Sequence, residues 1–353
     1  MLKKDFNNIL IIKPSSIGDV IHALPFLKAI RGRYPDAVIS WLINRGIDEI
    51  IRGNPNLDEV ILFERKRWGG FDDIGYKFKG LTEFIRELRQ KKFDLVIDLQ
   101  GLFRSGLITY LLGADSRIGF TNAREFSPIF YNYKVSHPPI EMHAVDRYLL
   151  IAKELGADIT KKDFKINIPE KEKRYAASLI SRNKKRPLIA INPSARWETK
   201  MWPLKRYAEL VDVIASKLKA QPVLIGSRED EVRINEMLSM TKSNPLNLSG
   251  KTSLLQLSAL LTKTDLLITN DSGPMHIAVA VGTPVVAIFG PTRPVRTGPY
   301  GSGHVVLQSG LPCVNCLKKR CNDLKCMEAI TVDDVLTAVK GILKNKKNKM
   351  VLA

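Results

Sequence analysis

The sequence is short of several features that would each point to a familiar class of protein. No apolar run approaches the ~18 residues that a membrane-spanning helix needs. The apolar stretch that follows the first few residues is too short for a secretory signal peptide. We therefore expect a protein that stays in the cytoplasm.

Common catalytic and nucleotide-binding motifs are also missing. No G-x-G-x-x-G follows a strand-like run and no G-x-x-x-x-G-K-[ST] occurs, so NAD binding and P-loop chemistry lose their main support. No order of Ser, His and acid suggests a hydrolase triad. The Asp-Asp pairs at 72–73 and 333–334 lie in no recognisable metal-site context.

Acidic residues are scarce relative to basic ones. The chain has 36 Asp and Glu against 55 Lys and Arg, a formal net charge of +19. This balance favours acidic partners such as nucleic acid, anionic lipid or phosphorylated substrates, although a solvated basic surface is the simpler explanation for much of it. The basic clusters lack interleaved aromatics and no nucleic-acid reader motif is visible, so nucleic-acid binding is a distant alternative.

Cysteine is confined to one short segment, which excludes a disulfide framework spread over the chain. The spacing is C-x2-C-x4-C-x4-C, formed by Cys313, Cys316, Cys321 and Cys326. Four thiolates so close together could hold a structural zinc or an iron–sulfur cluster. The intervals match no common ribbon or finger, however, and free thiols in a reducing compartment are the simpler interpretation.

Short apolar runs alternate with helix-like patterns along most of the chain. Such alternation predicts a doubly wound α/β protein with buried parallel strands. The expected strands are 8–13, 38–44, 59–63, 93–100, 116–120, 187–194, 222–227, 266–272 and 284–289. The expected helices are 20–33, 80–91, 101–112, 143–155, 205–219, 229–240, 253–263, 274–281 and 331–344.

A polar, charged stretch around 165–186 interrupts the alternation and indicates a domain boundary. We expect one Rossmann-like domain over 1–170 and a second over 171–330, facing a central cleft. A C-terminal helix and basic tail over 331–353 should follow, capped by "TVDD" at 331–334. In such sheets, ligands bind beyond the carboxyl ends of the strands.

The junction "IIKPSSIGDVIHALP" (11–25) places a lone acid, Asp19, between the first expected strand and the first expected helix. An acid at a helix N-terminus is favoured as a cap and by the helix dipole. Gly18 would also allow close approach of the backbone, and a carboxylate at a cleft mouth could accept a proton. Pro25 must lie in the opening turn of the helix or kink it.

The stretch "TNDSGPMHIAVAVGTPVVAIFGPT" (269–292) has the pattern of a strand, a tight turn and a helix. Pro274 suits the first helical turn, whose backbone N–H groups could bind phosphate. His276 could donate a hydrogen bond to a phosphate or sugar, or it could face the core. Asp271 could cap the helix or hold sugar hydroxyls.

Two further motifs follow expected strands of the second half. In "NPSARWETKMWP" (192–203), Lys200 is either a surface lysine or a cation able to neutralise a leaving diphosphate. In "GSREDE" (226–231), Asp230 and Glu231 lie where a ribose-binding acid of a Rossmann-like half is expected. An acidic first turn of a helix explains these two acids equally well.

Taken together, "KPSSIGDVIHALP", "NPSARWETKMWP" and "NDSGPMHIAVAVGTPVVAIFGPT" resemble the ADP-heptose:lipopolysaccharide heptosyltransferases of glycosyltransferase family 9. The resemblance covers nearly the whole chain and implies the GT-B architecture of two Rossmann-like domains. The segments "DLQGLFRSG" (98–106), "AREFSPIFYN" (123–132) and "HAVDRYLL" (143–150) look like the branch that adds the first heptose, heptosyltransferase I, rather than the second.

The resemblance implies an inverting, metal-independent transfer of L-glycero-D-manno-heptose from ADP-heptose to a Kdo hydroxyl of Kdo-lipid A. No cofactor is required. Asp19 would be the catalytic base, and Lys200 would stabilise the departing diphosphate. The expected partners are ADP-heptose, Kdo-lipid A and an anionic membrane surface, at the cytoplasmic face of the inner membrane. Alternatives are heptosyltransferase II or another family 9 transferase with a different acceptor.

The resemblance also implies binding residues in both halves. Those for the donor are Ser194, Lys200, Asp230, Glu231, Thr252, Asp271, Ser272, Gly273 and His276. Those for the acceptor are Ser16, Gly18, Arg65, Lys66, Arg67, Arg104 and Arg124. Lys200 and the turn at 272–273 would hold the diphosphate, Asp271 the heptose hydroxyls, and the acids at 230–231 the ribose.

Overall fold

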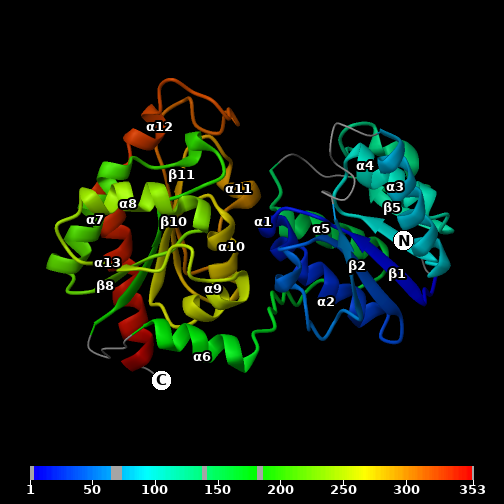
Figure 1. Cartoon of the computed structure of the whole chain (residues 1–353), viewed down its shortest axis with the longest axis horizontal. Coiled ribbons are helices and arrows are strands. Elements are labelled where there is room, and N and C mark those ends of the chain that lie inside the picture. Colours follow the sequence, from blue (N-terminus) through cyan, green and yellow to red (C-terminus); the bar gives the residue numbers. More distant parts are fainter. Residues whose placement is uncertain (1–3, 65–73, 137–140, 181–185, 352–353) are drawn as a thin grey trace. The chain divides into compact units, whose positions relative to one another are not determined.

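The chain divides into two compact units, Met1–Asn167 and Ile168–Ala353, each built around its own sheet (Figure 1). The structure is a computed structural model, and it describes residues 4–64, 74–136, 141–180 and 186–351. In the described part of the chain, no helix is long and apolar enough to cross a membrane.

The first unit contains a six-stranded parallel sheet with the order β3-β2-β1-β4-β5-β6. Its strands are β1 (Asn8–Ile12), β2 (Val38–Asn44), β3 (Glu59–Phe63), β4 (Leu95–Asp98), β5 (Ser116–Phe120) and β6 (Tyr133–Val135). Its helices are α1 (Ile17–His22), α2 (Leu24–Arg33), α3 (Ile74–Gln90), α4 (Phe103–Leu111) and α5 (Ala144–Glu154), with short 3-10 turns η1 (Asp48–Ile50) and η3 (Ser127–Phe130).

The second unit repeats this topology with the order β12-β11-β10-β7-β8-β9. Its strands are β7 (Leu188–Asn192), β8 (Gln221–Leu224), β9 (Leu246–Asn247), β10 (Leu266–Asn270), β11 (Val285–Phe289) and β12 (Val305–Gln308). Its helices are α6 (Glu170–Leu179), α7 (Leu204–Lys217), α8 (Glu231–Ser239), α9 (Leu254–Leu261), α10 (Gly273–Ala280), α11 (Pro294–Thr297), α12 (Lys325–Glu328) and α13 (Val332–Val351), with 3-10 turns η4 (Glu198–Lys200) and η5 (Arg228–Asp230).

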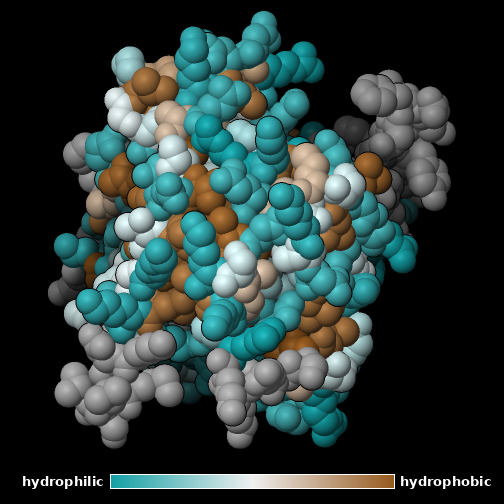
Figure 2. All heavy atoms as spheres, turned by 90° about the vertical axis from the view of Figure 1, so that its left-hand side faces the viewer, coloured by the Kyte–Doolittle hydropathy of each residue, from teal (hydrophilic) through white to brown (hydrophobic). Residues whose placement is uncertain are grey.

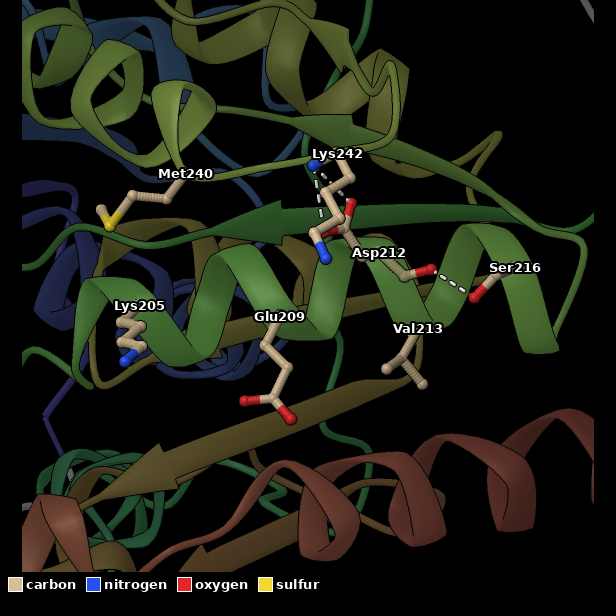
Figure 3. A pocket seen from close by; sticks show the side chains of 7 residues that line it. All are labelled: Lys205, Glu209, Asp212, Val213, Ser216, Met240 and Lys242. Atoms are coloured by element: carbon tan, nitrogen blue, oxygen red, sulfur yellow. Dashed lines mark hydrogen bonds between the residues drawn. The ribbon is translucent and has the colours of Figure 1, made fainter.

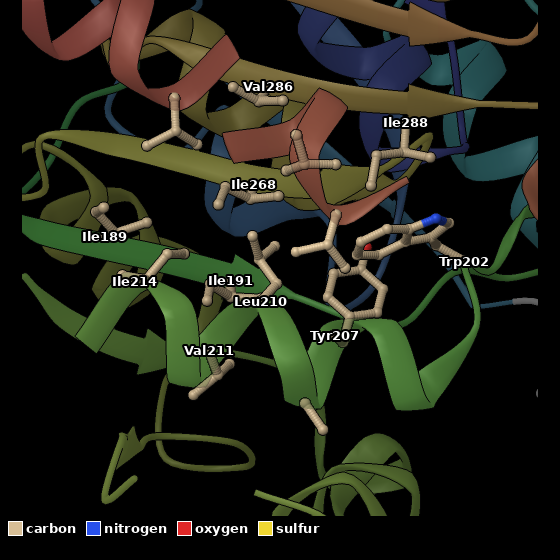
Figure 4. Packing of buried hydrophobic residues seen from close by; sticks show 14 of the residues in the cluster. Ile189, Ile191, Trp202, Tyr207, Leu210, Val211, Ile214, Ile268, Val286 and Ile288 are labelled. Atoms are coloured by element: carbon tan, nitrogen blue, oxygen red, sulfur yellow. The ribbon is translucent and has the colours of Figure 1, made fainter. Parts of the chain in front are cut away.

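The central strands are buried and mostly apolar because helices cover both faces of each sheet, as expected for parallel strands. In the second unit, Ile189 and Ile191 of β7 pack with Ile268, Val286 and residues of α7 (Figure 4). Figure 2 shows one face of this unit, where hydrophilic side chains cover most of the surface and hydrophobic patches lie between them.

Trp202 and Tyr207 form the end of this core that lies nearest to the loop after β7. Both are fully buried, and their rings meet edge to face at 4.9 Å (Figure 4). The Trp202 backbone N–H donates to Asn270 Oδ1 at 3.0 Å, and its indole N–H donates to Ile330 O at 2.9 Å. The loop that carries Lys200 is therefore fixed to the end of β10 and to the chain just before α13.

Most predicted elements are present, but the helix expected over 20–33 is wrong as a single element. It consists of α1 and α2, which Ala23 separates, and Pro25 lies in the opening turn of α2. Pro25 lacks a backbone N–H, and only the first turn of a helix tolerates that loss. The capping pattern at 331–334 is confirmed, because Thr331 Oγ1 donates to Asp334 Oδ2 and accepts from the Asp334 N–H.

Candidate active site

The strand order reverses at one place in each sheet, between β1 and β4 in the first unit and between β7 and β10 in the second. Loops that leave neighbouring strands in opposite directions open a crevice at their carboxyl ends, where ligands of doubly wound sheets bind. Asp19 follows β1, Lys200 follows β7 and Asp271 follows β10. The topology thus brings the main predicted site residues to the two switch points.

Lys200 and Asp271 form an ion pair at the switch point of the second unit. Lys200 Nζ lies 2.7 Å from Asp271 Oδ2, with side chains 16% and 7% exposed. The ring of Trp197 lies beside the same ammonium, at 4.6 Å from the ring centroid. Lys200 is therefore a partly buried cation with a fixed position rather than a solvated surface lysine.

The turn at Ser272 is held by the amide of Asn192, the last residue of β7. Asn192 Nδ2 donates to Ser272 Oγ at 2.9 Å and to Thr269 Oγ1 at 3.2 Å. It also lies 3.1 Å from the carbonyl of Ser194. This buried network fixes the backbone that leads into α10, so the N–H groups of its first turn point outward from a rigid end.

Ser194 is buried in the same loop. Its Oγ has no hydrogen-bond partner among the residues that the structure describes, and neither does Thr292 Oγ1. A buried hydroxyl without a partner costs about 1–3 kcal/mol. A ligand that supplied a polar atom at this edge of the sheet would offset that cost.

The remaining donor residues lie beyond β8 and β9, the next strands in the sheet. Asp230 Oδ2 accepts from the N–H and the hydroxyl of Ser227, so it acts as a cap. Glu231 begins α8 and lies against Gly250, whose N–H donates to Gly226 O. Thr252, partly buried, is two residues further on.

His276 is buried within α10, the helix that begins at Gly273. The sequence allowed two interpretations, a donor to a phosphate or sugar and a histidine that faces the core. The structure adds that its side chain is 7% exposed.

In the first unit, Asp19 is the third residue of α1 and forms a capping box with the N-cap residue Ser16. Its Oδ2 accepts from the Ser16 N–H at 3.1 Å and from Ser16 Oγ at 2.8 Å, and the peptide between Ser15 and Ser16 is cis. The capping interpretation is thus correct as a statement of geometry. Because 38% of the Asp19 side chain remains exposed, a substrate hydroxyl can still reach it.

A second carboxylate, Asp98, ends β4 beside this turn and is fully buried. It accepts from Ser105 Oγ at 2.8 Å, from Tyr131 Oη at 2.7 Å and from the N–H groups of Gln100 and Gly101. Burial raises the pKa of Asp98 even though these donors favour its charged form.

Only part of the predicted acceptor set can be placed. Gly18 is buried inside α1, and Ser16 is its N-cap residue. Arg104 on α4 and Arg124 before η3 are exposed. Arg65, Lys66 and Arg67 lie outside the described residues.

Comparison with known proteins decides the family. Residues 81–327 match the model of glycosyltransferase family 9 (heptosyltransferase). The chain belongs to this family. It is 28% identical over 300 residues to the lipopolysaccharide core heptosyltransferase OpsX of Haemophilus influenzae, covering 84% of this chain and 82% of that protein. It is 29% identical over 303 residues to lipopolysaccharide heptosyltransferase 2 of Escherichia coli, covering 82% and 85%.

Solved structures agree with the fold. A family 9 glycosyltransferase from Veillonella parvula superposes with a TM-score of 0.82 at 27% identity, covering 98% of this chain and 99% of the other. The E. coli heptosyltransferase WaaC, solved with ADP-2-deoxy-2-fluoro heptose, gives 0.72 at 25% identity, covering 95% and 99%. The heptosyltransferase described here therefore has the predicted GT-B architecture of two Rossmann-like units.

The four cysteines of this heptosyltransferase are free thiols, with Cys326 buried at α12 and the other three exposed. In the described ranges, no three His, Cys, Asp or Glu side chains are arranged to hold a metal ion. The segment is instead anchored by its backbone, because the Asn315 N–H donates to Gly290 O and the Leu317 N–H donates to Pro291 O. The geometry of the thiols thus does not fit the structural metal suggested by their spacing.

The cysteine segment contacts the loop that carries Lys200. Thr199 Oγ1 donates to Lys318 O at 2.9 Å, and Lys319 Nζ lies 5.3 Å from the ring centroid of Trp197. The exposed cations of this segment therefore lie beside the donor-site loop, which the sequence gave no reason to expect.

The heptosyltransferase also has a hollow beside α7 (Figure 3). Its lining consists of Lys205, Glu209, Asp212, Val213, Ser216, Met240 and Lys242. Both carboxylate oxygens of Asp212 accept from the backbone N–H of Lys242, each at 3.0 Å. None of the predicted site residues that the structure describes lines this hollow.

Sequence reasoning missed the residues that position the site. Asn192 and Thr269 fix the turn at Ser272, and Lys13 lies beside Asp19. All three lie at or just before the carboxyl end of an expected strand. This position is the sequence signal by which they could have been found.

Proposed function

We propose that this heptosyltransferase transfers L-glycero-D-manno-heptose from ADP-heptose to a Kdo hydroxyl of Kdo-lipid A during synthesis of the lipopolysaccharide inner core. The proposal is supported by the names of its relatives, which are heptosyltransferases of lipopolysaccharide. It is also supported by the donor analogue in the structure of the E. coli relative.

The observation that carries the donor assignment is the Lys200–Asp271 pair next to the turn at Ser272. Lys200 and the N–H groups at the start of α10 neutralise the diphosphate of ADP-heptose. Asp271 accepts hydrogen bonds from heptose hydroxyls, and Glu231, with Asp230 as a cap, lies at the ribose. Ser194, Thr252, Gly273 and His276 complete the donor site.

The transfer is inverting and uses Asp19 as the base. The acceptor oxygen attacks the anomeric carbon, its proton passes to the Asp19 carboxylate, and the bond from that carbon to ADP breaks with its electron pair leaving on the diphosphate. An ionised aspartate is a weak base, but it contributes roughly 10²–10⁴ in rate by taking the proton as the new bond forms. Lys200 and the α10 N–H groups stabilise the leaving group, so no metal is required.

The acceptor binds the first unit, through Ser16, Gly18, Arg104 and Arg124, together with the basic residues 65–67. The enzyme acts as a peripheral protein at the cytoplasmic face of the inner membrane. Two exposed apolar side chains support this location, because Phe126, the N-cap residue of η3, is 82% exposed and Ile129, within η3, is 68% exposed, close to Arg124 in the chain. A net charge of +19 favours an anionic bilayer.

Heptosyl-Kdo-lipid A is the second candidate acceptor. The chain is 29% identical to heptosyltransferase 2 of E. coli and 28% identical to OpsX, so sequence identity does not separate the two acceptors. The test is mass spectrometry of products from ADP-heptose with Kdo-lipid A or with heptosyl-Kdo-lipid A. Addition of one heptose to Kdo-lipid A supports the proposal. Addition only to the heptosylated acceptor would make the enzyme a heptosyltransferase II. No addition to either would overturn the lipopolysaccharide assignment.

A further inference from the structure

Lys13, the residue directly after β1, is almost completely buried. Its backbone is fixed, because its N–H donates to Leu42 O at 3.2 Å and its carbonyl accepts from Trp41 Nε1 at 3.1 Å. Lysine is seldom buried, since removing an ammonium from water is costly unless a group of opposite charge lies close. The partners of Lys13 therefore indicate what its burial achieves.

Three groups surround the ammonium. Nζ lies 3.2 Å from Gln100 Oε1, 4.0 Å from Asp19 Oδ1 and 5.6 Å from the ring centroid of Tyr148. Burial by itself lowers the pKa of Lys13. The neighbouring Asp19 carboxylate and the Tyr148 hydroxyl, with a smaller effect of Asp98, outweigh burial and raise that pKa, so Lys13 stays charged at neutral pH.

Asp19 is thus held from two sides. Ser16 donates to its Oδ2, and the Lys13 ammonium lies nearest to its Oδ1. Lys13 is enclosed by protein, whereas Asp19 is reachable from solvent. The cation therefore lies on the buried side of the carboxylate and does not contact the substrate.

We propose that Lys13 is a positioning residue for Asp19, and that its buried ammonium keeps the carboxylate ionised and oriented to accept the proton of the acceptor hydroxyl. This inference rests on the proposed role of Asp19 as the base. An ammonium about 4 Å from a carboxylate favours the charged form of that carboxylate. The base thereby stays ionised to lower pH and keeps one orientation toward the acceptor.

Other ionisable groups also lie near this site. Asp98 ends β4, Tyr148 and Arg147 belong to α5, and His22 belongs to α1. The His22 ring meets the ring of His143, the cap of α5, edge to face at 5.0 Å. These groups could also change the pH profile. A variant that lacks the Asp19 carboxylate shows which part of the profile belongs to Asp19.

The test replaces the ammonium with a neutral side chain of similar length. Lys13→Met and Lys13→Gln are compared with Lys28→Met, which removes an exposed lysine from α2 in the same unit. Without the cation, Asp19 takes up a proton more readily, so the acid limb of the kcat/KM profile should move up by about one pH unit. Because the carboxylate also loses its fixed orientation, we expect kcat at neutral pH to fall about tenfold, with KM for ADP-heptose unchanged.

Two results would overturn the inference. One is a neutral Lys13 variant that folds and keeps the wild-type acid limb, because a purely structural lysine would leave the pH profile where it is. The other is that both neutral variants fail to fold while Lys13→Arg folds, because the cation would then serve stability alone.

The role of Asp19 is tested separately in the same series. Asp19→Asn with normal turnover would remove the proposed base whatever Lys13 does. If Asp19→Asn is impaired as expected, adding Lys13→Met should cost little further activity, because the two residues act as one unit. A full additional tenfold loss in the double variant would show that Lys13 acts independently of Asp19 and would also refute the inference.

Discussion

Lys200 Nζ and Asp271 Oδ2 lie 2.7 Å apart, although the two residues are separated by 71 positions in the sequence. They meet because β7 and β10 are neighbouring parallel strands whose carboxyl ends reach the same edge of the sheet. The pair holds a cation next to the turn at Ser272. Its partner carboxylate is largely buried, which gives the pair a structural as well as a chemical role.

Lys200→Ala should lower both activity and stability. The loss of the cation should reduce kcat/KM for ADP-heptose by roughly 10²–10³. The uncompensated Asp271 carboxylate should reduce the free energy of unfolding by about 1–3 kcal/mol. Adding Asp271→Asn should restore stability without restoring turnover, as followed by urea unfolding and kinetics. Lys205→Ala, on the exposed start of α7, is the control.

Gly250→Ala should weaken ADP binding through Glu231. Gly250 has a φ of +67°, and a Cβ at this position would lie 2.0 Å from Glu231 Oε1. Gly282 has a φ of +78° with open space around it, so Gly282→Ala introduces similar backbone strain without the clash. Calorimetry should show ADP affinity about tenfold lower for the first variant only. Equal affinities would separate Glu231 from the nucleotide.

Tyr131→Phe should destabilise the first unit in a pH-dependent way. The hydroxyl of Tyr131 donates to the buried Asp98 carboxylate at 2.7 Å, a bond that lowers the otherwise raised pKa of Asp98. Loss of this donor should cost about 1–3 kcal/mol at a pH well above the pKa of Asp98, where the carboxylate is charged. The difference from wild type should shrink as the pH falls through the pKa of Asp98. A pH-independent difference in urea unfolding would show that packing alone was lost.

Cys326 should react more slowly with iodoacetamide than the other three cysteines. Burial, followed by the neighbouring thiols, raises the pKa of Cys326, so less of it is thiolate at a given pH. Cys313, Cys316 and Cys321 are exposed. Peptide mapping at pH 7.5 should find Cys326 modified at least about tenfold more slowly. Uniform reaction of all four would mean that α12 opens readily.

Removing the exposed apolar groups at η3 should weaken membrane binding. Phe126→Ser with Ile129→Ser should reduce sedimentation with vesicles that contain anionic lipid, while turnover on detergent-dispersed acceptor changes little. Val232→Ser is the matched control, because Val232 is 80% exposed on α8 of the other unit. An equal loss in both variants would reflect general hydrophobicity rather than a docking surface.

The sequence predicted the architecture well because buried parallel strands leave a strong signal. The runs at 38–44, 59–63 and 116–120 coincide with β2, β3 and β5. The missed elements lie where that signal is weak. The strand β9 has two residues, β12 is only half buried at a sheet edge, and the helix α6 has a charged surface that resembles a linker.

The candidate site was only partly accessible to sequence reasoning. Asp19, Lys200 and Asp271 stand in recognisable motifs after strands, so their neighbourhood could be anticipated. The burial of Lys13 could not be anticipated, because a single lysine after an apolar run is typical of the polar end of a strand. The anchoring of the cysteine segment on Gly290 and Pro291 depends on tertiary contacts that no local pattern records.

The bond from the Trp202 indole to Ile330 O has a consequence for how the enzyme is made. All six strands of the first unit precede residue 136, so that unit can fold while the ribosome is still translating the second. The core of the second unit instead includes Val335, Val339 and Ile342. The loop that presents Lys200 therefore lacks this second anchor until residue 330 has been synthesised, so a nascent chain can hold a folded first unit before the Lys200 loop is fully fixed.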